Sequence, residues 1–117
     1  MRTIIAGSRD FNDVDIFASE MKAFEKYITT VVCGGARGAD DMGRRWAIEN
    51  NIYVHMFPAN WKKYGKSAGI RRNVEMAKNA DALIAFWDGK SVGTKHMIDE
   101  AKKRNLKLYT CMYRELI

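Results

Sequence analysis

The sequence predicts an α/β fold, a single Rossmann-like, doubly wound domain with a five-stranded parallel sheet and helices on both faces. Short apolar runs alternate with segments of helical periodicity along the whole chain of 117 residues. This alternation is typical of a parallel sheet whose strands are joined by right-handed helical crossovers. No internal repeat or linker divides the chain, so one domain is expected over residues 1–117.

Five β-rich runs are the expected strands, and turn residues close the first three of them. The fourth run is the most hydrophobic, which predicts a strand in the centre of the sheet. In chain order the five runs are Thr3–Ala6, Thr29–Cys33, Ile52–Phe57, Ala82–Trp87 and Leu106–Cys111.

Four segments between these runs carry apolar residues at helical spacing. Asn12 or Asp13 is expected to cap the first helix and Thr94 the last, and the other two span about residues 39–50 and 68–79. The stretch Ala59–Gly69 is instead irregular, polar and aromatic, which predicts a binding loop. The residues expected to face inward are Val14, Phe17, Met21, Phe24 and Ile28, then Met42, Trp46 and Ala47, then Ile70, Val74 and Ala77, and finally Met97, Ile98 and Ala101.

Lysine and arginine number 20 against 14 aspartate and glutamate residues, which gives a net charge of +6. The basic residues fall in short clusters with acidic residues between them. An anionic partner is therefore expected. A nucleic acid is allowed by the sign of the charge but disfavoured by its distribution.

The sequence argues against a membrane or secreted protein. Its apolar runs are far too short to span a bilayer, and its start turns polar too soon for a signal peptide. The two cysteines, Cys33 and Cys111, form no disulfide framework, which favours a reducing cytoplasm. His55 and His96 lack zinc-like spacing to these cysteines, so neither a metal ion nor a cofactor is expected.

Glycines concentrate after the first, second and fourth expected strands, where six of the nine glycines lie. In a doubly wound sheet these loops meet at the carboxyl edge, where ligands bind at the reversal of strand order. Strand-to-helix turns need glycine anyway, but the paired glycines go beyond one per turn. The candidate ligand-binding residues of the three loops are Gly7, Ser8, Arg9, Asp10, Phe11, Gly34, Gly35, Ala36, Arg37, Gly38, Asp40, Trp87, Asp88, Gly89, Ser91, Gly93 and Thr94.

Four of these side chains have chemistry that suits a nucleotide. The guanidinium of Arg37 can donate two parallel hydrogen bonds to phosphate, and Asp88 can hold ribose hydroxyls. Asp40 lies near a helix start and can equally be a simple N-cap. Trp87 can stack on a base or belong to the core, and the two interpretations are level.

Five motifs closely resemble the YspA-like branch of the SLOG superfamily, and the resemblance runs from Arg2 to about Ala101. The resemblance implies a Rossmann-like nucleotide-binding domain, and it favours a homodimer. The motifs are Gly-Ser-Arg-Asp-Phe, Cys-Gly-Gly-Ala-Arg-Gly-Ala-Asp, Phe-Pro-Ala-x-Trp, Gly-Lys-x-Ala-Gly-x-x-Arg-Asn and Ala-Phe-Trp-Asp-Gly-x-Ser-x-Gly-Thr.

The superfamily includes DNA-processing protein A and the Lonely Guy phosphoribohydrolases, which cleave the N-glycosidic bond of nucleoside monophosphates. The functional arginine of those hydrolases corresponds to Arg72, and Asn73 follows it in the shared motif. The positions of their paired carboxylates hold His96 and Met97, so Asp88, Asp10 or Asp40 would have to replace them. Arg72 and Asp88 are the candidate catalytic residues, and Arg72 and Asn73 join the candidate ligand contacts.

Three functions fit these observations. The first is binding of a small phosphorylated nucleotide or nucleotide-derived ligand, as a sensor, carrier or sequestering module. The second is a phosphoribohydrolase-like N-glycosidase that acts on a nucleoside monophosphate, and the third is a DNA-binding module.

Overall fold

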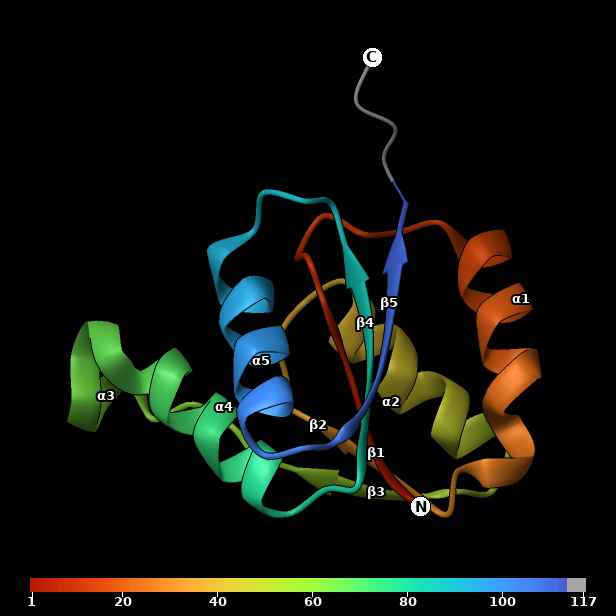
Figure 1. Cartoon of the computed structure of the whole chain (residues 1–117), viewed down its shortest axis with the longest axis horizontal. Coiled ribbons are helices and arrows are strands. Elements are labelled where there is room, and N and C mark those ends of the chain that lie inside the picture. The colour runs from red at the N-terminus through yellow and green to blue at the C-terminus, as the bar shows by residue number, and fades with distance from the viewer. Residues whose placement is uncertain (114–117) are drawn as a thin grey trace.

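Five parallel strands form one sheet in the computed structural model, which describes residues 1–113 (Figure 1). The order across the sheet is β3-β2-β1-β4-β5. The predicted α/β fold is therefore confirmed, and residues 114–117 of the expected domain lie outside the described residues. β4 is an inner strand, although β1 holds the middle position. The strands are β1 (Arg2–Gly7), β2 (Thr30–Cys33), β3 (Tyr53–Met56), β4 (Ala82–Trp87) and β5 (Lys107–Met112).

Helices cover both faces of the sheet, as the doubly wound arrangement requires. α1 and α2 lie on one face and α4 and α5 on the other, while the short helix α3 lies beyond α4 at the side of the molecule (Figure 1). No helix within residues 1–113 combines the length and the apolar character of a membrane span. The helices are α1 (Val14–Phe24), α2 (Ala39–Glu49), α3 (Trp61–Tyr64), α4 (Ala68–Lys78) and α5 (Val92–Lys103), with single 3₁₀ turns at Glu25–Tyr27 and Gly65–Ser67.

The strand order places a topological switch point between β1 and β4. The chain runs from β1 outward to β2 and β3, and then crosses back to place β4 on the other side of β1. Gly7 at the end of β1 pairs in register with Phe86 of β4, so the two strands end side by side. The loops that follow them diverge to opposite faces, which opens a crevice at the carboxyl edge of the sheet.

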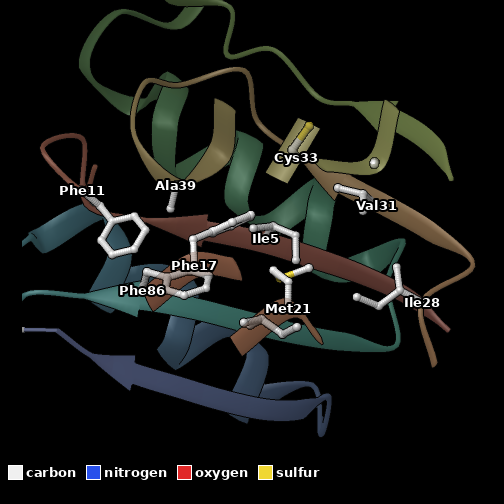
Figure 2. Packing of buried hydrophobic residues seen from close by; sticks show 11 residues of the cluster. Ile5, Phe11, Phe17, Met21, Ile28, Val31, Cys33, Ala39 and Phe86 are labelled. Carbon is white, nitrogen blue, oxygen red and sulfur yellow. The ribbon is translucent and has the colours of Figure 1, made fainter. Parts of the chain in front are cut away.

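The core consists of one apolar cluster on each face of the sheet. On the α1 and α2 face, Phe86 lies against Phe11 and Phe17, with ring centroids 4.8 and 5.2 Å apart (Figure 2). Phe11 is only 2% exposed, so this candidate ligand residue belongs to the core. On the other face, Met76 of α4 and Met97 of α5 pack in the second cluster.

Several expectations about the helices are wrong. Val14 and Ile70 are 67% and 53% exposed, because helical spacing identifies a face but not how far along the helix the sheet reaches. Both residues lie in the first turn of their helices. Ala59–Gly69 is not an irregular loop but holds α3 and a 3₁₀ turn. Asp13 caps α1, as expected, by accepting a hydrogen bond from Ile16 N–H at 3.0 Å.

The start of α5 also differs from expectation. Ser91, not Thr94, is the N-cap residue, and no side chain caps the helix. Instead the Asp88 carboxylate accepts hydrogen bonds from Lys90 N–H and Ser91 N–H, both at 2.8 Å. Thr94 is buried in the first turn, where its hydroxyl lies 3.2 Å from that of Ser91.

Gly43 tests how closely α2 packs on β1. A Cβ atom at this position would lie 2.6 Å from Cβ and Cγ2 of Ile5. Alanine normally gains about 1 kcal/mol over glycine inside a helix, but overpacking costs about 1–3 kcal/mol, so we expect Gly43→Ala to be destabilising overall. Urea unfolding measures the change.

Gly93 in α5 is the matched control, because a Cβ atom there would meet no atom within 4 Å. Gly93→Ala should leave the free energy of unfolding unchanged or raise it by up to about 1 kcal/mol. A gain of stability in Gly43→Ala would contradict the close contact between α2 and β1.

Candidate functional site

A cavity of about 290 Å³ lies at the switch point between β1 and β4. Its floor is apolar and includes Met76 and Met97, while polar residues of five segments form its sides. We call it the switch-point cavity. The candidate site residues that line it are Gly7, Arg9, Ala36, Asp40, Arg72, Asn73, Ser91, Gly93 and Thr94.

Asp40 is a buried carboxylate in the first turn of α2, with only 4% of its surface exposed. It accepts a hydrogen bond from Gly34 N–H at 3.2 Å. Burial raises the pKa of Asp40, although the nearby charge of Arg72 and hydrogen bonds from the backbone of Gly34, Ala36 and Gly7 lower it. Gly38 is the N-cap of α2, so the interpretation of Asp40 as a simple N-cap is wrong. Its carboxylate instead connects the end of β1, the β2–α2 loop and α2.

Arg72 is held by protein groups on two sides of its guanidinium. Nη1 donates a hydrogen bond to the Gly34 carbonyl at 2.7 Å, and Nε donates to the Asn73 side-chain oxygen at 3.1 Å. Burial lowers the pKa of Arg72, the charge of Asp40 raises it, and the charge of Arg9 lowers it. Within residues 1–113, Nη2 makes no hydrogen bond.

Asn73 links α4 to the first turn of α5. Its buried side-chain nitrogen donates to the Gly93 carbonyl at 3.2 Å and lies 3.1 Å from His96 Nδ1. His96 therefore interacts with Asn73, and Met97 forms part of the cavity floor. The first turn of α5 thus brings no carboxylate to the cavity.

Gly93 differs from the other loop glycines because a Cβ atom there would enter open space. Helices disfavour glycine, so this residue keeps space open in the cavity at a cost to α5. The other glycines have structural reasons, and their number alone does not mark a ligand site. At three of them a Cβ atom would overlap a neighbouring atom: Gly7, Gly34 and Gly38. Two others have a positive φ: Gly35 and Gly89.

Several candidate residues lie outside the cavity wall and support the loops instead. Ser8 is buried, and its hydroxyl accepts a hydrogen bond from Asp88 N–H at 3.4 Å. Asp10 accepts a hydrogen bond from the Tyr113 hydroxyl at 3.0 Å. Trp87 packs against the second core cluster, and its indole N–H donates to the Ser91 carbonyl at 3.0 Å.

Asp88, a candidate catalytic residue, is buried and does not line the switch-point cavity. Its carboxylate accepts the two backbone hydrogen bonds that form the turn into α5. The geometry therefore supports a structural contribution from Asp88, while Arg72 lines the cavity.

Comparison with known proteins identifies the family. A family model described as "YspA, cpYpsA-related SLOG family" matches residues 1–64. The chain belongs to this SLOG family. It is similar to "Gene 61 protein" of Mycobacterium phage D29, with 41% identity over 115 residues that cover 90% of this chain and 91% of that protein. No solved structure matches the chain. SLOG membership indicates a nucleotide-related ligand in general.

The SLOG match includes the loops after β1 and β2, but eight of the cavity-lining residues are not among the candidate site residues, and two of these eight have aromatic or charged side chains. Trp61 of α3 and Lys66 of the following 3₁₀ turn both line the switch-point cavity. The signal that could have found them is the charge of residues 50–74, which hold five of the 20 basic residues and none of the 14 acidic ones. The statement that acidic residues lie between the basic clusters is therefore wrong for this stretch, which accounts for nearly all of the net charge of +6.

Thiol and metal chemistry find little support in this SLOG chain. Burial raises the pKa of the Cys33 thiol to about 11, and its sulfur lies 3.1 Å from that of Met56. Such a thiol is a poor nucleophile. Within residues 1–113, no three His, Cys, Asp or Glu side chains come together as a metal site.

The raised pKa of Asp40 predicts a pH dependence of stability. Because this pKa lies above the ordinary value of 3.8, the folded state keeps the proton to higher pH than the unfolded state does. The contribution of Asp40 to the free energy of unfolding is therefore largest at pH values below the ordinary pKa of 3.8. It falls as the pH rises from there toward the folded-state pKa. Asp40→Asn lacks this dependence.

We expect the stability of Asp40→Asn relative to the natural chain to rise with pH above about 4, by up to about 1.4 kcal/mol per pH unit. Urea unfolding of both proteins across this range measures the slope. Asparagine and aspartate also differ in hydrogen bonding. This difference shifts the free energy of unfolding of the variant by the same amount at every pH. Parallel pH profiles would contradict the raised pKa.

Proposed function

We propose that this SLOG chain binds a phosphorylated nucleotide-type ligand in the switch-point cavity. The observation that carries the proposal is the open space at Gly93, at the amino end of α5 and in a cavity that Arg9 and Arg72 also line. Backbone N–H groups and the positive end of the helix dipole favour phosphate at such a position. The family supports a ligand of this class.

The proposed contacts follow from the cavity wall. Arg72 Nη2 and the first turn of α5 would hold phosphate, and Thr94 would offer a hydroxyl. Met76 and Met97 would contact an apolar part of the ligand. The candidate residues outside this cavity are assigned to supporting the loops, except for those that line a second cavity beside it: Gly34, Gly35 and Arg37.

The proposal is binding without turnover, as a sensor, carrier or sequestering module. An N-glycosidase needs a carboxylate near the sugar to stabilise the positive charge that develops there. The first turn of α5 offers none, and among residues 1–113 Asp40 is the acidic residue that lines the cavity. Cytoplasmic location and a homodimer stay predictions.

Titration calorimetry with AMP, GMP, CMP and UMP tests the proposal. We expect saturable binding of at least one of them, and a loss of about 1–3 kcal/mol of binding free energy in Gly93→Ala, because the added methyl group enters the ligand's space. Lys102→Ala, in the last turn of the same helix, should bind as the natural chain does.

The outcomes are distinct. The proposed site would be overturned if none of the four nucleotides binds. It would also be overturned if Gly93→Ala binds with the same affinity as the natural chain. Free base released during the titration would favour the N-glycosidase.

Nucleic-acid binding is a second candidate, favoured by the acid-free stretch of residues 50–74. Trp61 and Tyr64 of α3 are 51% and 38% exposed beside the basic residues of this stretch. Exposed rings next to cations are typical of surfaces that bind single strands by stacking and phosphate contacts.

Fluorescence anisotropy of a labelled oligothymidylate tests this candidate. The affinity would fall steeply as the salt concentration rises. Binding releases counterions from the phosphates, and this release is less favourable when the surrounding salt concentration is high. The double variant Lys62→Ala, Lys63→Ala would bind more weakly, whereas Lys102→Ala would bind unchanged. No rise in anisotropy even at low salt would exclude this candidate.

A further inference from the structure

A second cavity lies beside the switch-point cavity and shares part of its wall. It has a volume of about 390 Å³ and lies between the β2–α2 loop and the segment that follows β3. We call it the outer cavity. Its own wall includes Arg37 and Met56. Four residues line both cavities: Arg9, Ala36, Trp61 and Arg72.

The shared wall contains two arginines, and each has N–H donors that make no hydrogen bond within residues 1–113. Arg9 is exposed and makes no hydrogen bond or ion pair within residues 1–113. Arg72 Nη2 likewise makes no hydrogen bond within the described part of the chain. The two positive charges repel each other, as the effect of Arg9 on the pKa of Arg72 shows. An anion with more than one negative charge between them would relieve this repulsion.

Each cavity offers a different surface away from this junction. The switch-point cavity reaches Met76 and Met97, and its polar groups away from the junction include those of the first turn of α5. The outer cavity is lined by Arg37, by backbone at Gly34 and Gly35, and by apolar Met56 and Pro58. Arg37 does not line the switch-point cavity, so a ligand confined there would not use it.

We propose that the ligand is a nucleoside diphosphate derivative with a second polar group, whose diphosphate lies between Arg9 and Arg72 and whose two ends occupy the two cavities. This inference rests on the proposed function and names the ligand class of the same site. The switch-point cavity alone is near the lower limit of ligand pockets, about 300 Å³, and the outer cavity more than doubles the space available. Trp61 lies in the wall of both cavities and can pack along the connecting part of such a ligand.

The test compares AMP, ADP, ADP-ribose and UDP-glucose by titration calorimetry on the full chain. At least one of the two diphosphate sugars should bind tenfold or more tightly than AMP and more tightly than ADP. Arg37→Ala should lower that affinity about tenfold, which is the loss expected for one hydrogen bond to a charged group, and should leave AMP binding unchanged. Gly93→Ala should weaken the binding of both AMP and the diphosphate sugar.

Arg45→Ala is the matched control, because it removes the same charge from an exposed position of α2 where Arg45 pairs with Asp41 at 2.9 Å. It should not change the affinity for any of the four compounds. A loss in Arg45→Ala equal to that in Arg37→Ala would show a net-charge effect and overturn the assignment of Arg37.

The remaining outcomes separate this inference from the proposed function. If AMP binds as tightly as the diphosphate sugars and Arg37→Ala changes nothing, the two-cavity ligand is overturned and nucleotide binding stands. If ADP binds as tightly as the diphosphate sugars, the outer cavity holds no part of the ligand and the inference fails. If none of the compounds binds and the four monophosphates also fail, both proposals fall.

Discussion

The buried carboxylate of Asp40 organises the carboxyl edge of the sheet. Buried backbone N–H groups need an acceptor, and Asp40 provides one where the chain leaves β1 and β2 and no strand continues. Arg72 lies close enough to compensate this buried charge, and it bonds the Gly34 carbonyl in turn. Asn73 then extends the contacts to Gly93 at the start of α5. The relative positions of α2, α4 and α5 therefore depend on one acidic residue.

This network explains why the cavity combines an apolar floor with charged walls. Removing a partner from a buried charged pair leaves the other uncompensated, so neither Asp40 nor Arg72 is free to be apolar. The methionines that line the cavity belong to the core and give it apolar surface. Another part of the wall carries the cationic side chains of Arg9 and Lys66 and the ring of Trp61. The absence of acidic residues from residues 50–74 makes this part of the wall positive, and a positive wall attracts anions more than neutral molecules.

Much of the fold could be predicted from the sequence, because a buried parallel strand needs a continuous apolar run whatever surrounds it. Details that depend on contacts between distant segments could not. Phe11 stands in a polar loop but folds back onto Phe86, a residue 75 positions away. Trp61 lies in a stretch without periodicity, so no pattern placed it in a cavity wall. The acceptor role of Asp40 likewise depends on loops that only the folded sheet brings together.

The location of the carboxylates favours binding over hydrolysis. A sugar that loses its base develops positive charge, which a nearby carboxylate stabilises. Asp88 lies outside the switch-point cavity, and its Oδ1 accepts both hydrogen bonds of the turn before α5. Asp40 lines the cavity, but its carboxylate accepts a hydrogen bond from Gly34 N–H and lies beside the charge of Arg72. Both carboxylates are therefore engaged by the protein itself. Arg72, by contrast, keeps one nitrogen without a hydrogen bond within residues 1–113, and a phosphate can use that donor whether or not any bond is broken.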